Sequence, residues 1–146
     1  MYGYAYVGHG VAGLSQVIGV SLTSETELIQ KVQDGLSFTA LEELGKKLNL
    51  SQAAFLEVLD LSRSTYHRRK EEGRLTASES DLIVRIAQVV AHTEEVFEPT
   101  EAAQEWLTTP ISALLGKTPL QFSATERGAN YVHIILSNLE AGNFFA

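Results

Sequence analysis

The sequence predicts an all-α fold. Along most of the chain, apolar residues recur at three- and four-residue steps, the period of a helix that buries one face. Serine or threonine precedes most of these segments, as expected for helix N-caps, and glycine or proline follows several of them. No stretch reads as a ladder of strands, and no segment repeats.

The bulk composition is that of one globular domain, or of two small domains that share an interface. With 146 residues, 45% of them hydrophobic, the chain can bury a core without a metal or a disulfide. It contains no cysteine, its apolar runs are too short for a membrane span, and its N-terminus lacks a positively charged leader. We therefore expect a cytoplasmic protein with no cofactor and no metal site.

The first 24 residues differ from the rest of the chain. They are rich in glycine and tyrosine and contain no charge other than His9, so we expect an irregular arm over residues 1–24. Gly8 to Gly13 spells GxGxxG. A dinucleotide site needs this loop between a strand and a helix, and no βαβ unit is predicted, so we interpret the match as chance.

Four capped helical segments are predicted between residues 24 and 73. Each begins with a serine whose side chain can accept a hydrogen bond from the first turn, and the last one closes at a glycine. The segments are 25–33 after Ser24, 37–50 beginning at Ser37, 52–59 after Ser51, and 63–72 between Ser62 and Gly73.

The C-terminal half is predicted to be helical as well. A helix from about Ser78 to Phe97 can begin with a capping box formed by Thr76 and Glu79 or by Ser78 and Asp81. The remaining predicted elements are a short helix over 100–107, brief turns and helices over 110–124, and a last helix that begins after Thr125 and ends before Gly142.

Residues 51–73 have the pattern of a helix-turn-helix. The two short helices are joined by 60–62, a connection of the length that this motif requires, although Asp60 replaces the usual turn glycine. The second helix would present an outward face to base edges in the major groove of DNA. The residues expected on that face are Arg63, Ser64, His67 and Arg68. Those expected to pack inside are Phe55, Leu56, Leu59, Leu61 and Tyr66.

The charge distribution favours DNA binding at this motif. The net charge is −7, yet residues 46–74 hold seven basic and four acidic residues, whereas the remainder holds four basic and fourteen acidic. A single cluster of basic residues in an otherwise acidic protein is expected when one element contacts DNA. Helix-turn-helix proteins usually act as dimers, and either the helix at 78–97 or the arm at 1–24 could supply the dimer contact. Further candidates for phosphate contacts are Lys46, Lys47, Arg69, Lys70 and Arg74.

Two sets of residues share spacings with a known family. The first is the helix-turn-helix with its Gly73-Arg74-Leu75 link into a Ser-Glu-Ser-Asp helix start. The second comprises Trp106-Leu107, Thr109-Pro110, Gly116-Lys117-Thr118-Pro119, Thr125-Glu126 with Gly128, and Glu140 with Gly142. Over about residues 35–146 the chain therefore resembles the Xre/MbcA/ParS family of antitoxins. Ile111 and Leu115 depart from the family pattern, which often has Asn and a second Gly there.

The resemblance implies function and domain organisation. It implies an antitoxin of a RES-domain toxin, an enzyme type that consumes NAD, and it implies a homodimer that represses its own operon by binding operator DNA. It divides the chain into the arm at 1–24, a helix-turn-helix DNA-binding and dimerisation region at 25–98, and a toxin-binding domain at 99–146. No enzymatic activity of the chain itself is expected.

The C-terminal tail is the candidate toxin contact. It ends in two large aromatic side chains and a free carboxylate, and each phenylalanine is worth roughly 1.5–3 kcal/mol when buried. Two interpretations stay open: the tail and the last helix block the NAD pocket of the toxin, or the two phenylalanines fold back onto their own helix. The candidate residues are Glu140, Asn143, Phe144, Phe145 and Ala146.

Other function classes stay open at this point. Two alternatives are a stand-alone transcription regulator whose C-terminal half dimerises or senses a ligand, and an interaction protein that reuses the helix-turn-helix shape. The four histidines show no metal-ligand spacing, and no serine nucleophile elbow is present.

Overall fold

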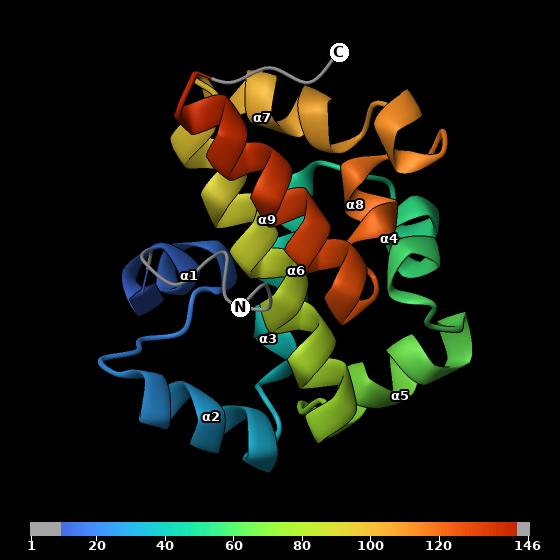
Figure 1. Cartoon of the computed structure of the whole chain (residues 1–146). Helices are drawn as coiled ribbons and strands as arrows, with labels where there is room; N and C mark the ends of the chain where they lie inside the picture. The colour runs from blue at the N-terminus through green and yellow to red at the C-terminus, as the bar shows by residue number, and fades with distance from the viewer. Residues whose placement is uncertain (1–9, 143–146) are drawn as a thin grey trace.

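The computed structural model describes residues 10–142 of the chain, and the regular elements within that range are all helical, as predicted. Figure 1 shows their arrangement. The elements are α1 (Gly10–Ile18), α2 (Glu25–Asp34), α3 (Phe38–Leu48), α4 (Gln52–Leu59), α5 (Arg63–Glu72), α6 (Ala77–Val96), α7 (Thr100–Leu107), the 3₁₀ helix η2 (Ser112–Leu114), α8 (Pro119–Phe122) and α9 (Glu126–Glu140).

The helices begin at the predicted capping residues. Ser37 caps α3 by accepting a hydrogen bond from the backbone N–H of Thr39. In four other helices the side-chain oxygen of the N-cap accepts from the backbone N–H three residues later, and these caps are Ser24, Ser51, Ser62 and Thr125. These interactions are local, so the same residues that signal a helix start in the sequence also stabilise it in the structure.

Helix α6 uses one of the two capping boxes that the sequence allows. Thr76 accepts from the backbone N–H of Glu79, and the Glu79 carboxylate accepts from the backbone N–H of Thr76. The helix therefore begins one residue before the predicted start at Ser78.

The expectation of an irregular arm over residues 1–24 is wrong for residues 10–18, which form α1. Leu14, Val17 and Ile18 on this helix are at most 2% exposed, and α1 packs against α3 and α6. A Cβ placed on Gly13 would lie 3.5 Å from the Cβ of Ala91 on α6. Small residues at these two positions therefore allow α1 and α6 to approach closely. Burial of the apolar face outweighs the low helix propensity of glycine.

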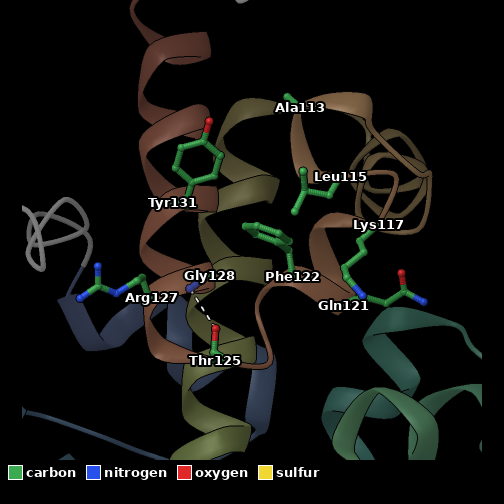
Figure 2. Close-up of a pocket in the computed structure, with 9 residues that line it drawn as sticks. All are labelled: Ala113, Leu115, Lys117, Gln121, Phe122, Thr125, Arg127, Gly128 and Tyr131. Carbon is green, nitrogen blue, oxygen red and sulfur yellow. Dashed lines mark hydrogen bonds between the residues drawn. The ribbon is translucent and has the colours of Figure 1, made fainter.

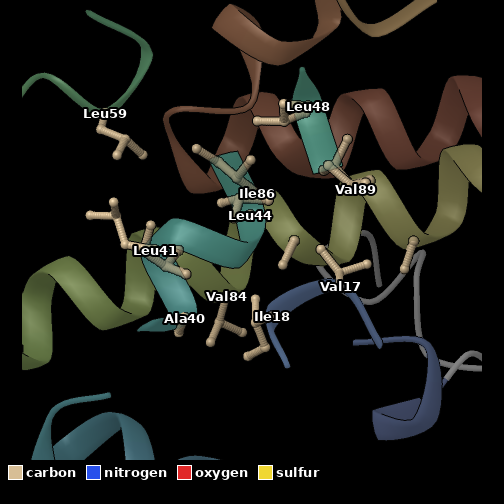
Figure 3. Packing of buried hydrophobic residues seen from close by; sticks show 14 of the residues in the cluster. Val17, Ile18, Ala40, Leu41, Leu44, Leu48, Leu59, Val84, Ile86 and Val89 are labelled. Atoms are coloured by element: carbon tan, nitrogen blue, oxygen red, sulfur yellow. The ribbon is translucent and has the colours of Figure 1, made fainter. Parts of the chain in front are cut away.

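Helix α6 is the centre of the molecule. It contacts α1, α2, α3, α7 and α9, and half of its twenty residues are buried. Figure 3 shows Leu41, Leu44 and Leu48 of α3 among the residues that pack beside Ile86 and Val89 of α6. One continuous core therefore joins the helix-turn-helix to the C-terminal helices. No helix within residues 10–142 is long and apolar enough to cross a membrane.

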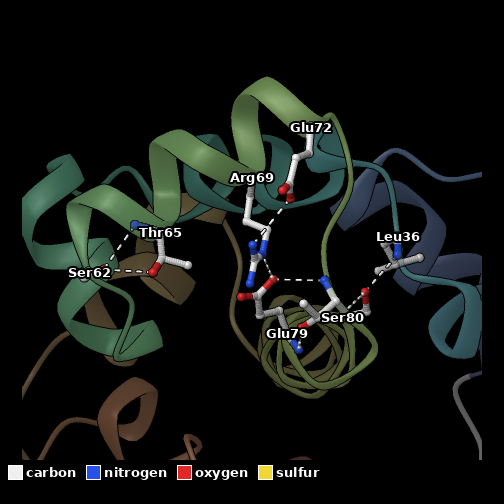
Figure 4. Close-up of polar contacts among 8 residues, drawn as sticks. Leu36, Ser62, Thr65, Arg69, Glu72, Glu79 and Ser80 are labelled. Carbon is white, nitrogen blue, oxygen red and sulfur yellow. Dashed lines mark hydrogen bonds and ion pairs between the residues drawn. The ribbon is translucent and has the colours of Figure 1, made fainter.

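Residues 35–38, before the helix-turn-helix, and residues 73–75, after it, pair with each other beside the start of α6. Backbone hydrogen bonds run from Leu75 N to Leu36 O at 2.8 Å and from Phe38 N to Gly73 O at 3.0 Å. The backbone N–H of Leu36 donates to the Ser80 hydroxyl, which is buried at the start of α6 (Figure 4). Gly35 has φ 91°, and a Cβ there would overlap the carbonyl of Leu75. These contacts fix the entrance and the exit of the helix-turn-helix.

Candidate functional site

The turn between α4 and α5 has the shape that the helix-turn-helix requires. Asp60 adopts the left-handed conformation with φ 53°, and its N–H donates to the carbonyls of Leu56 and Glu57. Aspartate is among the few non-glycine residues that enter this conformation readily, because its short polar side chain adds little steric cost. The replacement of glycine by Asp60 therefore leaves the turn intact.

The predicted interior of the motif is confirmed. Phe55, Leu56 and Leu59 are each 5% exposed, and Leu61 packs half-buried against the same core. The Tyr66 ring is 9% exposed and meets the Phe38 ring edge to face, with centroids 5.2 Å apart. Helix α5 is therefore held by one side against α3 and α4, which leaves its other side for a ligand.

The predicted outward face of α5 lies in solvent. Arg63, Ser64, His67 and Arg68 are all exposed. Within residues 10–142 neither Arg63 nor Arg68 forms an ion pair or a side-chain hydrogen bond. The two guanidinium groups can therefore bind phosphate or a guanine edge without breaking a contact within this part of the chain.

Arg69 and Arg74 have structural partners instead. The Nε of Arg69 donates to Glu79 Oε1 at 2.7 Å, and its Nη1 lies 3.4 Å from Glu72 Oε1 (Figure 4). Arg74 donates to the carbonyl oxygens of Gly35 and Asp34 at 2.7 and 3.2 Å. Both arginines therefore support the motif, and their predicted phosphate contacts stay a prediction.

In the Arg69–Glu79 pair, each side chain shifts the pKa of the other. The hydrogen bond to Glu79 raises the pKa of Arg69 above its ordinary value. Desolvation by partial burial raises the pKa of Glu79, but hydrogen bonds from Arg69 and Thr76 outweigh it, so the pKa of that carboxyl is lowered overall. The pair is charged at neutral pH and ties α5 to the first turn of α6.

The three lysine candidates occupy different environments. Lys70 is exposed on α5 and makes no ion pair within the described part of the chain. Lys46 lies 3.2 Å from Glu43 with three quarters of its side chain exposed, a contact that solvent weakens. Lys47 lies 3.2 Å from Glu94 of α6, so it links α3 to α6.

In the C-terminal half, Glu140 has a partner that the sequence did not indicate. Its Oε1 lies 2.9 Å from His92 Nε2, and His92 Nδ1 lies 2.9 Å from His133 Nδ1. The two buried imidazole rings stack with centroids 5.2 Å apart. The histidines are 41 residues apart on α6 and α9, so no local spacing signals the pair. Asn143, Phe144, Phe145 and Ala146, the other predicted toxin contacts, lie outside the described residues.

A pocket of about 670 Å³ opens between η2, α8 and α9 (Figure 2). Sequence analysis did not anticipate this pocket, although several of the family-like residues line it. The lining residues are Ala113, Leu115, Lys117, Gln121, Phe122, Thr125, Arg127, Gly128 and Tyr131. We refer to it as the Leu115 pocket.

Comparison with known proteins gives two family matches. Residues 27–88 match the antitoxin Xre-like helix-turn-helix domain, and residues 92–142 match the antitoxin Xre/MbcA/ParS C-terminal toxin-binding domain. The first match contains α3 to α5, and the second contains Glu140 and the Leu115 pocket.

Several curated proteins are similar over most of their length. The chain is 30% identical to an antitoxin Xre from Pseudomonas putida, over 83% of this chain and 76% of that protein. It is 30% identical to an antitoxin Xre from Yersinia enterocolitica, over 87% of each. A protein from Sphingobium named Prs ADP-ribosylating antitoxin is 22% identical, over 83% of this chain and 82% of that protein.

Proposed function

Because the chain belongs to the Xre-like antitoxin family, we propose that it neutralises a RES-domain, NAD-consuming toxin and represses its own operon as a homodimer on operator DNA. The observation that carries the DNA-binding part is that Arg63 and Arg68 are exposed and make no ion pair within residues 10–142, on a helix-turn-helix with a buried core. Operator contact would come from Arg63, Ser64, His67 and Arg68, with phosphate contacts from Lys70 and, more weakly, Lys46.

The toxin-binding part is assigned to residues 99–146. In this proposal residues 143–146 occupy the NAD pocket of the toxin. Glu140 acts from α9, where His92 holds its carboxylate. The name of the Sphingobium relative includes ADP-ribosylation, a reaction that draws on NAD, and this favours a toxin with NAD chemistry.

Homodimerisation is part of the same proposal. A single helix-turn-helix buries too little DNA surface for tight binding, so two copies would read half-sites about one helical turn apart. Of the two regions considered for the dimer contact, α6 is already contacted by five other helices of the same chain. In the other region, 1–24, residues 10–18 form α1 and pack against α3 and α6, so both regions stay candidates for the dimer contact.

Coexpression with the neighbouring gene tests the proposal directly. We expect the two proteins to co-purify and the toxin to lose its NAD-consuming activity in the complex. Deletion of residues 143–146 should restore toxin activity, and full neutralisation by the shortened chain would remove the tail from the mechanism.

A second experiment tests operator binding. The protein should bind a palindrome near its own promoter with an affinity that falls steeply as salt rises, because each phosphate contact releases counterions. If the protein binds this DNA but no neighbouring gene encodes a toxin, the alternative, a stand-alone helix-turn-helix regulator, is favoured.

A further inference from the structure

We propose that the Leu115 pocket is a second toxin contact, which receives an apolar side chain from a toxin segment that also carries acidic residues. The inference rests on the proposed antitoxin function. It assigns part of the affinity for the toxin to a surface separate from the C-terminal tail. Such a contact would hold the toxin before and while the tail occupies its NAD pocket.

The pocket exposes apolar surface that the chain itself does not cover. Leu115 is 82% exposed and Tyr131 is 43% exposed, and these are two of the three large hydrophobic residues that stand exposed within residues 10–142. Figure 2 shows Phe122 below Leu115, with Tyr131 on the neighbouring helix α9. The Phe122 and Tyr131 rings lie 6.0 Å apart in a tilted arrangement, so they form an ordered apolar wall.

The leucine side chain at position 115 adds a backbone cost that its own burial does not offset within the described structure. Leu115 N donates to Ser112 O at 3.0 Å and Gly116 N to Ile111 O at 3.1 Å, but a glycine would make the same backbone hydrogen bonds. Leu115 follows η2 in the left-handed conformation with φ 61°, which disfavours a leucine and would suit a glycine. Sparsely populated backbone states with a large side chain concentrate at binding sites. An exposed leucine in a glycine conformation is therefore best explained by a contact with another molecule.

The charges around the pocket select an acidic partner. Lys117 and Arg127 line it, and neither forms an ion pair or a side-chain hydrogen bond within the described residues. Outside residues 46–74 the chain has only four basic residues against fourteen acidic ones, so two unpaired cations at one apolar pocket stand out. An acidic segment of the toxin would pair with both cations at the pocket.

The position of the pocket favours the toxin over a second copy of this chain. All nine lining residues lie within residues 92–142, the part that matches the toxin-binding domain. The helix-turn-helix, where two copies must be spaced on DNA, is formed by α4 and α5 and contributes no lining residue.

Leu115→Gly is the sharpest test, because it removes the apolar anchor and relieves the backbone at the same time. We expect a Tm equal to or above that of the wild type and a Kd for the purified toxin that rises by about tenfold or more. The control is Ile29→Gly: this apolar side chain is 50% exposed and belongs to α2, which lies apart from α8 in the fold (Figure 1). Its Kd for the toxin should not change.

The charges are tested by the double variant Lys117→Glu with Arg127→Glu. Toxin affinity should fall, and the loss should shrink as salt rises because exposed charge pairs are screened. Wild-type toxin affinity in both the glycine and the double variant would overturn the pocket proposal alone. A change in homodimer mass with unchanged toxin affinity would overturn it in favour of a second copy. No complex between the wild type and the toxin would overturn the proposed function itself.

Discussion

At the scale of single residues, neighbouring side chains on α5 have separate tasks. Arg68 is exposed and makes no ion pair in the described part of the chain, whereas the Arg69 side chain is 15% exposed and donates to Glu79. Adjacent positions on a helix point about 100° apart, so one arginine can face DNA while the next faces α6. The two arginines should therefore respond differently to the same substitution.

Arg68→Met should weaken operator binding roughly tenfold, the loss of about one base or phosphate contact, and should leave Tm and toxin neutralisation unchanged. Arg69→Met should lower the free energy of unfolding by about 1–2 kcal/mol after screening by solvent, because it leaves Glu79 partly buried without its cation. Electrophoretic mobility shifts and urea unfolding distinguish the two. Equal loss of DNA binding in both variants with unchanged stability would contradict the division of roles.

The Glu79 carboxylate should make the free energy of unfolding depend on pH in the acidic range. Its folded pKa lies below its ordinary value of 4.5, so its contribution to stability is fully present above that value and is lost as pH falls through the folded pKa. The stability advantage of the wild type over Glu79→Gln should therefore be constant near neutral pH and shrink on acidification below about pH 4.5. Urea unfolding of both proteins across this range measures the difference, and a constant difference down to pH 3 would exclude the carboxylate as its source.

At the scale of elements, glycine determines how closely two segments approach. Gly128 lies in the first turn of α9, where its N–H donates to the Thr125 cap at 3.0 Å. A Cβ at this position would overlap the backbone carbonyl of Phe122 at the end of α8. The sharp connection between α8 and α9, and with it one wall of the Leu115 pocket, therefore depends on the absence of a side chain.

Gly128→Ala should destabilise the protein by more than about 2 kcal/mol, because backbone cannot yield as a flexible side chain does. Gly13→Ala in α1 is the matched control: its Cβ would meet the Ala91 Cβ at 3.5 Å, an ordinary contact. Alanine has the better helix propensity, so this control should be neutral or stabilise by up to about 1 kcal/mol. Thermal unfolding of both variants gives the comparison, and similar Tm values would contradict the steric argument.

At the scale of the whole molecule, α6 couples the two functional regions. The helix-turn-helix packs on α6 through α3 and the Arg69–Glu79 pair, and α7 and α9 pack on other parts of the same helix. Because both regions use one core, neither has a complete hydrophobic interior without the other. The proposed toxin-binding surface and the proposed DNA-binding surface of this chain thus belong to one folded unit.

We expect the full chain to unfold in a single cooperative transition, with equal calorimetric and van't Hoff enthalpies at fixed protein concentration. A chain that ends at residue 98 lacks α7 to α9 and exposes apolar surface on α6, so it should show no such transition or should aggregate. Differential scanning calorimetry tests both expectations. Two separate transitions in the full chain would show that the regions fold independently.

The sequence by itself determined the features that depend on neighbouring residues. Serine and threonine caps, apolar periodicity and the short connection at 60–62 act within a few residues, and these predicted the helices, the helix-turn-helix and the outward face of α5. The family resemblance depended on further spacings, in the link at 73–75 and in the C-terminal half from Trp106 to Gly142, and the two family matches confirm it.

Tertiary structure decided what depends on residues distant in the chain. Helix α1 exists because α3 and α6 bury its apolar face, a gain that outweighs its glycines. Leu14, Val17 and Ile18 have helical spacing, but the spacing alone does not show which partner helices will bury them. The partners of Arg74 and His92 lie about forty residues away, so their roles follow from packing alone. The Leu115 pocket is likewise assembled from three elements, and the chemistry of a surface is set by what folding brings side by side.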